Sequence, residues 1–250
     1  VIVAGGVGPY SEQIRVVGQA TSPQAIAYKR NMTLLDVMLA EGVKNLIFSS
    51  SCTVYGEPDT LPVNETMPVK PAASVYGNTK RVGEEILHDV AAANALRVLS
   101  LRYFNPIGAH PSARIGELPR GVPSNLVPFV TQTAAGLRGK LRVNGKDYAT
   151  SDGTCVRDYI HVMDLARAHV VALGWMEQRT GSTCEVFNLG TGRGNTVMEV
   201  VNTFAEVNAV DVPYEIGPRR AGDVEAVYAD TTKSREVLGW TCDHDLRDAL

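Results

Sequence analysis

The sequence has no excess of basic residues, no long apolar run and no signal-like N-terminus. Lys and Arg number 24 against 27 Asp and Glu, so the formal charge of -3 argues against general binding to nucleic acid or to an anionic membrane. No stretch approaches the roughly 20 consecutive apolar residues that a membrane helix needs, and no basic segment with an apolar run opens the chain. These absences favour a cytoplasmic protein with a small-molecule partner.

Cysteine is also scarce. The four cysteines lie far apart, without the spacing of a metal site or the density of a disulfide framework. They are Cys52, Cys155, Cys184 and Cys242. We therefore expect no bound metal and reduced thiols, which also fits the cytoplasm. With 44% hydrophobic and 20% charged residues, the chain has enough apolar mass to bury a core.

Short β-branched runs alternate with helical patterns along the chain. Buried strands are predicted at residues 1–5, 44–49, 98–103 and 186–190, and helices at residues 32–39, 82–93, 164–176 and 196–207. Asp164 is the expected N-cap of the third helix. This alternation predicts an α/β fold with a doubly wound, Rossmann-like parallel sheet and right-handed crossovers.

Prolines, glycines and basic residues dominate residues 111–148 and predict a region of loops and short elements. We expect residues 1–110 to form a partial dinucleotide-binding domain that carries the catalytic residues. Residues 111–250 should form mainly a smaller substrate-binding region, with about 155–190 returning to the sheet. Because the chain opens on Val1 and stops at Leu250, just after a helix expected to begin at Asp245, we expect it to be cut at both ends.

Tyr76 and Lys80 stand four positions apart at the start of a predicted helix, so both project from one face, roughly 5.4 Å apart along the axis. A phenol needs a nearby cation to act as a base near neutrality, and Lys80 is placed to supply one. Such pairs also occur by chance on exposed helices. Ser51 ends a predicted strand, where ligands of open parallel sheets bind, although serines there also form turns and caps. The combination of the three indicates a catalytic site.

Four segments carry a family resemblance. They are residues 48–56 (FSSSCTVYG), 76–80 (YGNTK), 101–110 (LRYFNPIGAH) and 152–162 (DGTCVRDYIHV). In this order they resemble the successive signatures of UDP-glucose/UDP-galactose 4-epimerases, which are extended short-chain dehydrogenase/reductase enzymes. The resemblance runs from about Asn31 to Asp245, which is most of the chain.

The resemblance implies an NAD-dependent isomerase that interconverts UDP-glucose and UDP-galactose in galactose metabolism. Tyr76 would take the proton of the sugar 4-hydroxyl while NAD takes hydride from C4. Lys80 would lower the pKa of Tyr76 and hold the nicotinamide ribose, and Ser51 would assist proton transfer. The 4-ketose would turn over within the site and regain hydride on its other face, and the cofactor would carry the hydride throughout.

Binding residues also follow from the resemblance. Those implied to touch the cofactor are Tyr76, Lys80, Tyr103, Ser49 and Asn31. Those implied to touch the UDP-hexose are Ser51, Cys52, Thr53, Tyr103, Phe104, Asn105, Ser124, Asn125, Leu126, Arg142, Val143, Asn144, Arg157, Val227, Arg220 and Asp223. Among these, Arg157 and Arg220 would clamp the diphosphate, which suits a guanidinium fork. The family also implies a homodimer formed through residues 33–39 and 82–89.

Some of these residues have simpler interpretations. Arg157 beside Asp158 could form a surface ion pair, and His161 is interpreted as a buried, hydrogen-bonded imidazole. Tyr159 and Ile160 are interpreted as core residues. Val227 falls where the family varies the size of a residue beside the sugar, so we hypothesise that its modest volume admits an N-acetyl group.

The N-terminal part departs from the family. The family's first strand and glycine-rich turn are missing, because residues 6–11 (GVGPYS) imitate that turn without its third glycine, and no acidic residue follows roughly 20 residues later. Residues 1–5 match the fourth family strand instead, with an exposed edge. Val7 replaces a cofactor-binding lysine, residues 8–24 match nothing, and Asn144 replaces an aromatic residue that stacks on uracil. We therefore expect the isolated chain to bind NAD poorly and to be weakly active or inactive.

Other functions stay open. Related nucleotide-sugar dehydratases carry an Asp-Glu pair where this chain has Cys52 and Thr53, so dehydration loses its acid and base. Decarboxylase and reductase relatives share Tyr76, Lys80 and Ser51. A different class of answer is an inactive fragment that only binds nucleotide sugars.

Overall fold

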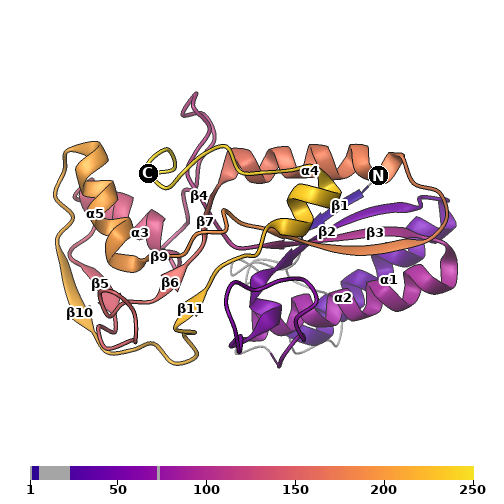
Figure 1. The fold of residues 1–250 in the computed structure, drawn as a ribbon, viewed down its shortest axis with the longest axis horizontal. Coiled ribbons are helices and arrows are strands. Elements are labelled where there is room, and N and C mark those ends of the chain that lie inside the picture. The colour runs from indigo at the N-terminus through magenta and orange to yellow at the C-terminus, as the bar shows by residue number, and fades with distance from the viewer. Residues whose placement is uncertain (1, 6–22, 72–73) are drawn as a thin grey trace.

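The computed structural model describes residues 2–5, 23–71 and 74–250. It places them in a larger lobe built on a sheet and a smaller lobe of short elements (Figure 1). The expectations for residues 6–11, for Val7 and for most of segment 8–24 lie outside the described residues.

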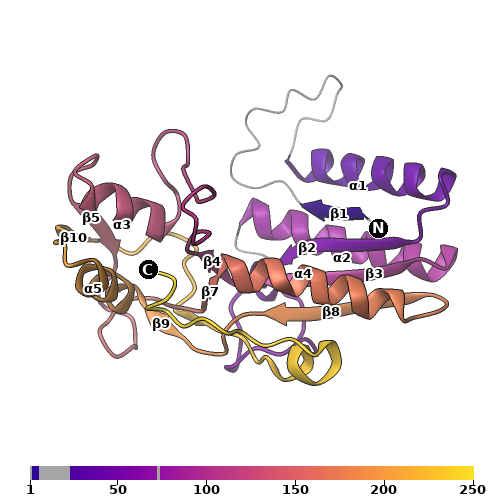
Figure 2. The same ribbon diagram turned by 90° about the horizontal axis from the view of Figure 1, so that it is seen from above.

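A parallel four-stranded sheet forms the larger lobe. Its strands, in spatial order, are β1 (Ile2–Gly5), β2 (Asn45–Ser51), β3 (Arg97–Tyr103) and β8 (Thr183–Leu189). All neighbouring pairs are parallel, as predicted. Among the described strands, β1 is the outermost on its side. The carboxyl ends of the strands point toward the smaller lobe (Figure 2).

Helices cover both faces of this sheet. α1 (Pro23–Ala40) and α2 (Val75–Asn94) lie side by side on one face, and α4 (Val162–Glu177) lies on the other (Figures 1 and 2). Strand alternation separates the two cores, because Leu46 and Phe48 pack with α1 and α2 whereas Ile47 packs with α4. The predicted doubly wound arrangement is confirmed.

The smaller lobe consists of short elements. They are α3 (Leu126–Ala134), α5 (Val197–Asn208), β4 (Asn105–Ile107), β5 (Leu141–Asn144), β6 (Val156–Arg157), β7 (Tyr159–His161), β9 (Asn195–Thr196), β10 (Tyr214–Gly217) and β11 (Ala226–Val227). A 3-10 turn spans Cys52–Tyr55 and a π-helical turn spans Ser234–Leu238. An apolar cluster that includes Val130, Leu141 and Phe204 joins α3, β5 and α5.

Two local predictions were wrong. His161, not Asp164, caps α4, and its side chain accepts a hydrogen bond from the Met163 amide. Asp164 is buried in the first turn of the helix, where it pairs with Arg167 and His244. The helix expected from Asp245 is a turn over residues 246–249, in which Asp245 accepts bonds from following backbone amides. Asp245 thus binds local backbone amides, as N-cap residues do, whereas Asp164 accepts hydrogen bonds from the amides of Asp243 and His244, far away in the sequence.

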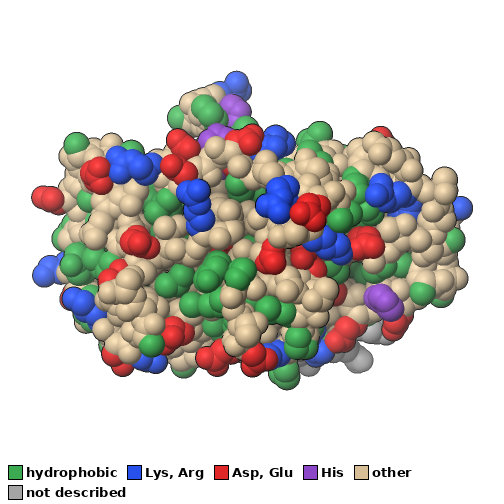
Figure 3. Space-filling model, viewed as in Figure 1, with side chains coloured by type: hydrophobic (Ala, Val, Ile, Leu, Met, Phe, Trp, Pro, Cys, Tyr) green, Lys and Arg blue, Asp and Glu red, His purple; other side chains and the backbone are tan. Residues whose placement is uncertain are grey.

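Charges of both signs are interspersed over the face shown in Figure 3. Within residues 2–5, 23–71 and 74–250, no helix combines the length and apolar character needed to span a bilayer. The same described residues contain no group of three or more side chains arranged to hold a metal ion.

Candidate active site

The first turn of α2 presents the predicted catalytic pair. Ser74 caps the helix by accepting a hydrogen bond from the Gly77 amide at 3.0 Å, so Tyr76 lies in the first turn and Lys80 one turn later. The Lys80 ammonium lies 5.3 Å from the centroid of the Tyr76 ring. The two side chains therefore share one face of the helix, as their spacing predicted.

A close approach of α2 to β2 brings Lys80 to the strand end. A Cβ on Gly83 would lie 2.8 Å from the Phe48 ring, so only glycine allows the helix to pack this tightly on the strand. Lys80 is consequently 3% exposed, and its Nζ donates a hydrogen bond to the Ser49 carbonyl at 2.5 Å.

Ser51 completes the catalytic trio at the carboxyl end of β2. Its Oγ accepts bonds from the Thr53 amide at 3.2 Å and from the Thr53 hydroxyl at 2.9 Å, and it caps the 3-10 turn that follows. Ser51 lies close enough to the Tyr76 phenol for its hydroxyl to lower the pKa of Tyr76. The structure thus brings Tyr76, Lys80 and Ser51 together.

Burial dominates the electrostatics of this trio. It raises the pKa of Tyr76, and the hydrogen bond with Ser51 opposes that rise. Burial also lowers the pKa of Lys80 to about 8, and the charge of Glu84 opposes that fall. Desolvation therefore sets the direction of the Tyr76 pKa, and the expectation that Lys80 lowers this pKa stays a prediction.

The remaining residues implied to touch a cofactor lie on β2, β3 and α1. The Tyr103 hydroxyl lies 2.7 Å from Ser49 Oγ and 2.5 Å from His169 Nε2, and burial raises its pKa to about 12. Asn31 lies in α1, and its amide nitrogen faces Gly83 of α2. His169, on α4, was missed by sequence reasoning because no motif marks it.

Three residues implied to touch the sugar form part of a buried cluster instead of an open wall. Cys52, Phe104 and Val227 pack together with Val54 and Tyr55. Burial raises the pKa of the Cys52 thiol to about 12, so it is protonated at neutral pH. The cluster directly adjoins Ser51 and gives that side of the site an apolar lining. Thr53, whose hydroxyl binds Ser51, belongs to the same turn.

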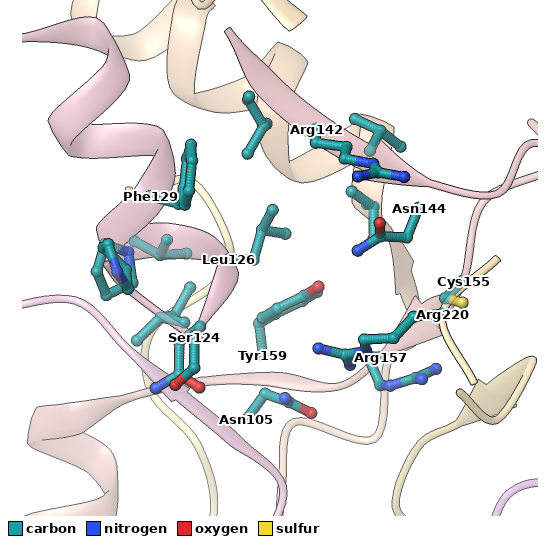
Figure 4. A pocket seen from close by; sticks show the side chains of 18 of the residues that line it. Asn105, Ser124, Leu126, Phe129, Arg142, Asn144, Cys155, Arg157, Tyr159 and Arg220 are labelled. Carbon is teal, nitrogen blue, oxygen red and sulfur yellow. The ribbon is translucent and has the colours of Figure 1, made fainter. Parts of the chain in front are cut away.

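A cavity of about 450 Å³ lies in the smaller lobe, beyond the strand ends. Its lining includes the implied substrate residues Asn105, Ser124, Asn125, Leu126, Arg142, Val143, Asn144, Arg157, Arg220 and Asp223. In Figure 4 the polar side chains of Arg142, Asn144, Arg157 and Arg220 lie along one side, whereas Leu126 and Phe129 lie opposite. The cavity therefore offers an apolar wall and a cationic wall, which suits a nucleoside diphosphate.

Two guanidinium groups in this cavity converge on one carboxylate. Arg220 binds Asp223 through Nε at 3.1 Å and Nη2 at 2.5 Å, and Arg157 Nη2 lies 3.8 Å from the same Asp223 oxygen. Asp158 is fully buried and faces away to other partners. The alternative interpretation of Arg157 and Asp158 as a surface ion pair is therefore wrong.

Sequence reasoning missed several cavity-lining residues. Phe129 and Leu141 line the cavity and lie outside every motif, and the apolar spacing of α3 was the available signal for Phe129. Cys155 also lines the cavity and lies in the motif at residues 152–162, but it was given no binding role. Tyr159 and Ile160 are buried as predicted, but Tyr159 also lines the cavity. His161 is buried and hydrogen-bonded, as interpreted, and its ring stacks on His244 at 4.5 Å.

Comparison with known proteins points in one direction. A family model described as GDP-mannose 4,6 dehydratase matches residues 25–250. The UDP-glucose 4-epimerase of Mus musculus is 47% identical over 233 residues, which cover 91% of this chain and 67% of that protein. The UDP-glucose 4-epimerase of Bacillus subtilis (strain 168) is 46% identical over 240 residues, which cover 94% of this chain and 70% of that protein.

Solved structures agree. A UDP-glucose 4-epimerase from Bifidobacterium longum in complex with NAD+ and UDP has a TM-score of 0.86 and 43% identity, and the match covers 90% of this chain and 67% of that one. The UDP-glucose 4-epimerase from Stenotrophomonas maltophila with bound NAD and formylated UDP-arabinopyranose has a TM-score of 0.84 and 46% identity. This match covers 94% of this chain and 71% of that one. The chain thus spans about two thirds of the length of its relatives.

These identities and the four ordered motifs, together with the Tyr76, Lys80 and Ser51 site at the carboxyl ends of a parallel sheet, place the chain in the UDP-glucose 4-epimerase family of Rossmann-like, NAD-dependent short-chain dehydrogenase/reductase enzymes.

Proposed function

We propose that this protein interconverts UDP-glucose and UDP-galactose by transient, NAD-dependent oxidation at C4 of the sugar. The observation that carries the proposal is the meeting of Tyr76, Lys80 and Ser51 at the carboxyl end of β2. A separate cavity that suits a nucleoside diphosphate lies farther into the smaller lobe, and Asn105, just after β3, is among its lining residues. Residues 1–110 are assigned to cofactor binding and catalysis. Residues 111–250 are assigned mainly to substrate binding, apart from α4 and β8, which complete the larger lobe.

The residues around Lys80 fit a bound nicotinamide ribose. Among the described residues, Lys80 makes one hydrogen bond, to the Ser49 carbonyl, and an ammonium has three donors. Two donors are therefore available for ribose hydroxyls, while Tyr103 and Ser49 supply hydroxyls nearby and Asn31 an amide on the neighbouring helix. NAD, when bound, supplies the acceptor and donor of hydride at C4.

The chain's own residues move the proton and hold the sugar. Tyr76 is the base that takes the proton of the sugar 4-hydroxyl and later returns it. Ser51 assists this transfer through a hydrogen bond from its own hydroxyl. Because burial raises the Tyr76 pKa, the phenolate requires a neighbouring positive charge, which Lys80 provides when protonated. Arg157 and Arg220 hold the diphosphate, and Leu126 with Phe129 contacts the base.

Turnover of UDP-galactose tests this proposal directly. The full-length protein is incubated with UDP-galactose and NAD, and the product sugar is identified; UDP-glucose is the expected product, whereas residues 1–250 on their own are expected to turn over weakly or not at all. Release of carbon dioxide from a UDP-uronic acid would instead indicate a decarboxylase. Net oxidation or reduction of the sugar would indicate a dehydrogenase or reductase. UDP binding with no turnover of any UDP-hexose, at saturating NAD, would leave only a nucleotide-sugar binder.

Arg157→Gln is expected to weaken UDP binding by roughly 10- to 100-fold, because a charge-assisted contact to phosphate contributes about 1.5–3 kcal/mol. The substitution should leave the shape of the cavity unchanged, because the Arg157 side chain donates a hydrogen bond to the Val156 carbonyl at 2.8 Å and lies 3.8 Å from Asp223. Calorimetric titration with UDP measures the effect. Arg219→Gln is the matched control, because Arg219 pairs with Asp147 at the surface and should leave UDP affinity unchanged. Equal affinities for all three proteins would remove Arg157 from the diphosphate site.

Val227 tests sugar selectivity. This side chain lies in the buried cluster with Cys52 and Phe104, next to Ser51. We expect the wild-type protein to turn over UDP-GalNAc as well as UDP-galactose, and Val227→Phe to reduce turnover of the acetylated sugar at least tenfold more than that of UDP-galactose, since added volume crowds the larger substituent. Paired kcat/KM values for the two sugars provide the measurement. Absence of UDP-GalNAc turnover by an otherwise active wild type would reject the hypothesis.

We also assign the protein to the cytoplasm and to a homodimer. Four unpaired cysteines support a reducing compartment. α1 packs beside α2 and leaves the apolar side chains of Val37 and Leu39 exposed at 54% and 40%, which a partner subunit would cover. Light scattering after gel filtration reports the mass in solution, and Val37→Asp should convert a dimer to a monomer.

A further inference from the structure

Glu84 occupies an unusual place beneath the catalytic pair. It follows Lys80 by one turn of α2, and its carboxylate is nearly buried. Arg102 of β3 binds it with both Nε, at 3.0 Å, and Nη2, at 2.6 Å. Ser50 donates a further hydrogen bond to the same carboxylate at 2.5 Å. Glu84 therefore joins α2 to β2 and β3 directly under the strand ends.

This ion pair is hard to explain by stability alone. Replacing a buried ion pair by well-packed apolar residues is often neutral or stabilising, so its presence points to a role in placing groups. Arg102 stacks 4.7 Å from the Tyr55 ring centroid, and its Nη1 finds no hydrogen-bond partner among the described residues. A buried donor without a partner adds a further cost.

The strand pattern shows what Glu84 holds. Consecutive residues of β2 point to opposite faces of the sheet. The Ser50 side chain therefore points toward Glu84, whereas the side chains of Ser49 and Ser51 point to the other face, where Ser49 binds the Tyr103 hydroxyl. The Ser49 carbonyl receives Lys80, and Ser51 interacts with Tyr76. The hydrogen bond from Ser50 to the Glu84 carboxylate therefore holds the backbone at the end of β2, and with it the positions of Ser49 and Ser51.

Charge provides a second link between Glu84 and Lys80. Burial lowers the pKa of Lys80 to about 8, and the carboxylate charge of Glu84 is the effect that opposes it. The titratable and charged groups around Lys80 and Glu84 are Tyr76 on α2, Cys52 after β2, Arg102 and Tyr103 on β3, Tyr55 in the 3-10 turn, Cys184 on β8 and His169 on α4. Cys52 and Tyr103 have pKa values raised to about 12, so they do not titrate near pH 8.

We infer that Glu84 is a positioning residue for the proposed epimerase reaction: held by Arg102 and Ser50, its buried carboxylate keeps Lys80 protonated and in place beside Tyr76. This inference rests on the proposed function in one respect, because the kcat/KM measurement below requires that the protein epimerises a UDP-hexose. Glu84 touches neither sugar nor cofactor and acts through Lys80 and the end of β2.

The test is the pH profile of three variants compared with the wild type. The alkaline limb of kcat/KM marks the loss of the Lys80 proton. Glu84→Gln keeps the shape of the side chain but removes its charge, so the Lys80 pKa falls further and the limb is expected to move to lower pH by about one unit. Glu84→Asp withdraws the charge by one methylene group and is expected to shift the limb in the same direction by about half as much.

Glu85→Gln is the matched control. It removes the same charge from the next position of α2, where Glu85 is exposed and pairs with Arg81. Its limb should coincide with that of the wild type. Circular dichroism verifies that each variant is folded, and Glu84→Asp carries the test if Glu84→Gln does not fold.

NAD affinity over the same pH range provides a second readout that needs no turnover. If the wild type binds NAD but epimerises no sugar, the proposed function fails, while the shift between variants still tests the inference. An alkaline limb that stays at the wild-type pH in Glu84→Gln, whatever the loss of rate, would overturn it. A limb that moves equally in Glu85→Gln would also overturn it.

Discussion

Replacing Tyr76 by phenylalanine is expected to lower kcat for UDP-galactose epimerisation by about a thousandfold, because a positioned general base contributes roughly 10²- to 10⁴-fold. KM should change little, because the phenol would contact the sugar through one hydroxyl only. Most of the substrate binding energy is expected to come from the contacts of Arg157 and Arg220 with the diphosphate. The ring itself stays, so its stacking against the Lys80 ammonium at 5.3 Å is retained. A coupled assay of UDP-glucose formation measures both constants.

Tyr214→Phe is the control for this prediction. Tyr214 lies on β10, is largely exposed and takes no part in the site, so its hydroxyl can be removed without effect on rate. Unchanged binding of NAD and UDP by Tyr76→Phe would show that the loss is chemical. A kcat within tenfold of the wild type would assign proton transfer to another group, with Ser51 as the nearest hydroxyl.

The catalytic trio was predictable because it depends on local spacing and on strand ends. Tyr76 and Lys80 are four residues apart on a helix, and Ser51 closes a strand with a strong apolar pattern, so the fold brings them together wherever that strand is parallel to its neighbours. The strands and helices of the larger lobe followed from the same patterns. The observed helix ends differ from the predicted ones, because the first residues of α2 and α4 are set by the N-caps Ser74 and His161. The spacing of apolar residues does not reveal these caps.

Contacts over long sequence separation were not predictable in the same way. The partner of Arg157 is Asp223 and not the adjacent Asp158, because β6 and β11 lie side by side although they are far apart in sequence. Likewise, Glu84 and Arg102 meet only because α2 packs across β3. No period in the sequence encodes either pairing.

The direction of the Tyr76 pKa also required the structure. Spacing alone shows that a cation is near the phenol, but the balance between that cation and desolvation depends on burial. Burial in turn depends on how closely α2 approaches β2, which Gly83 permits. Burial therefore sets the direction of the pKa shift at both Tyr76 and Lys80, and the charge of Glu84 opposes the shift at Lys80.

Asp158 shows how a buried carboxylate can organise the junction between the lobes. It is fully buried and accepts four hydrogen bonds. The donors are the Thr191 amide and hydroxyl, both at 2.7 Å, the Gly192 amide at 3.0 Å and the Ala229 amide at 3.1 Å. These partners belong to the turn after β8 and to the segment after β11, so one side chain fixes two crossing segments next to the cavity.

Asp158→Asn is expected to destabilise the protein by about 2–5 kcal/mol, because an amide group replaces one acceptor oxygen and faces two backbone N–H donors, each of which loses its bond. No rearrangement relieves this, since Gly190 lies so close that a Cβ there would be 2.4 Å from the Asp158 carboxylate. The midpoint of urea denaturation reports the change, and Asp211→Asn, at an exposed position, is the control. Since Asp158 follows Arg157 directly, UDP affinity should fall together with stability. A variant as stable as the wild type would mean that this carboxylate is not what joins the two segments.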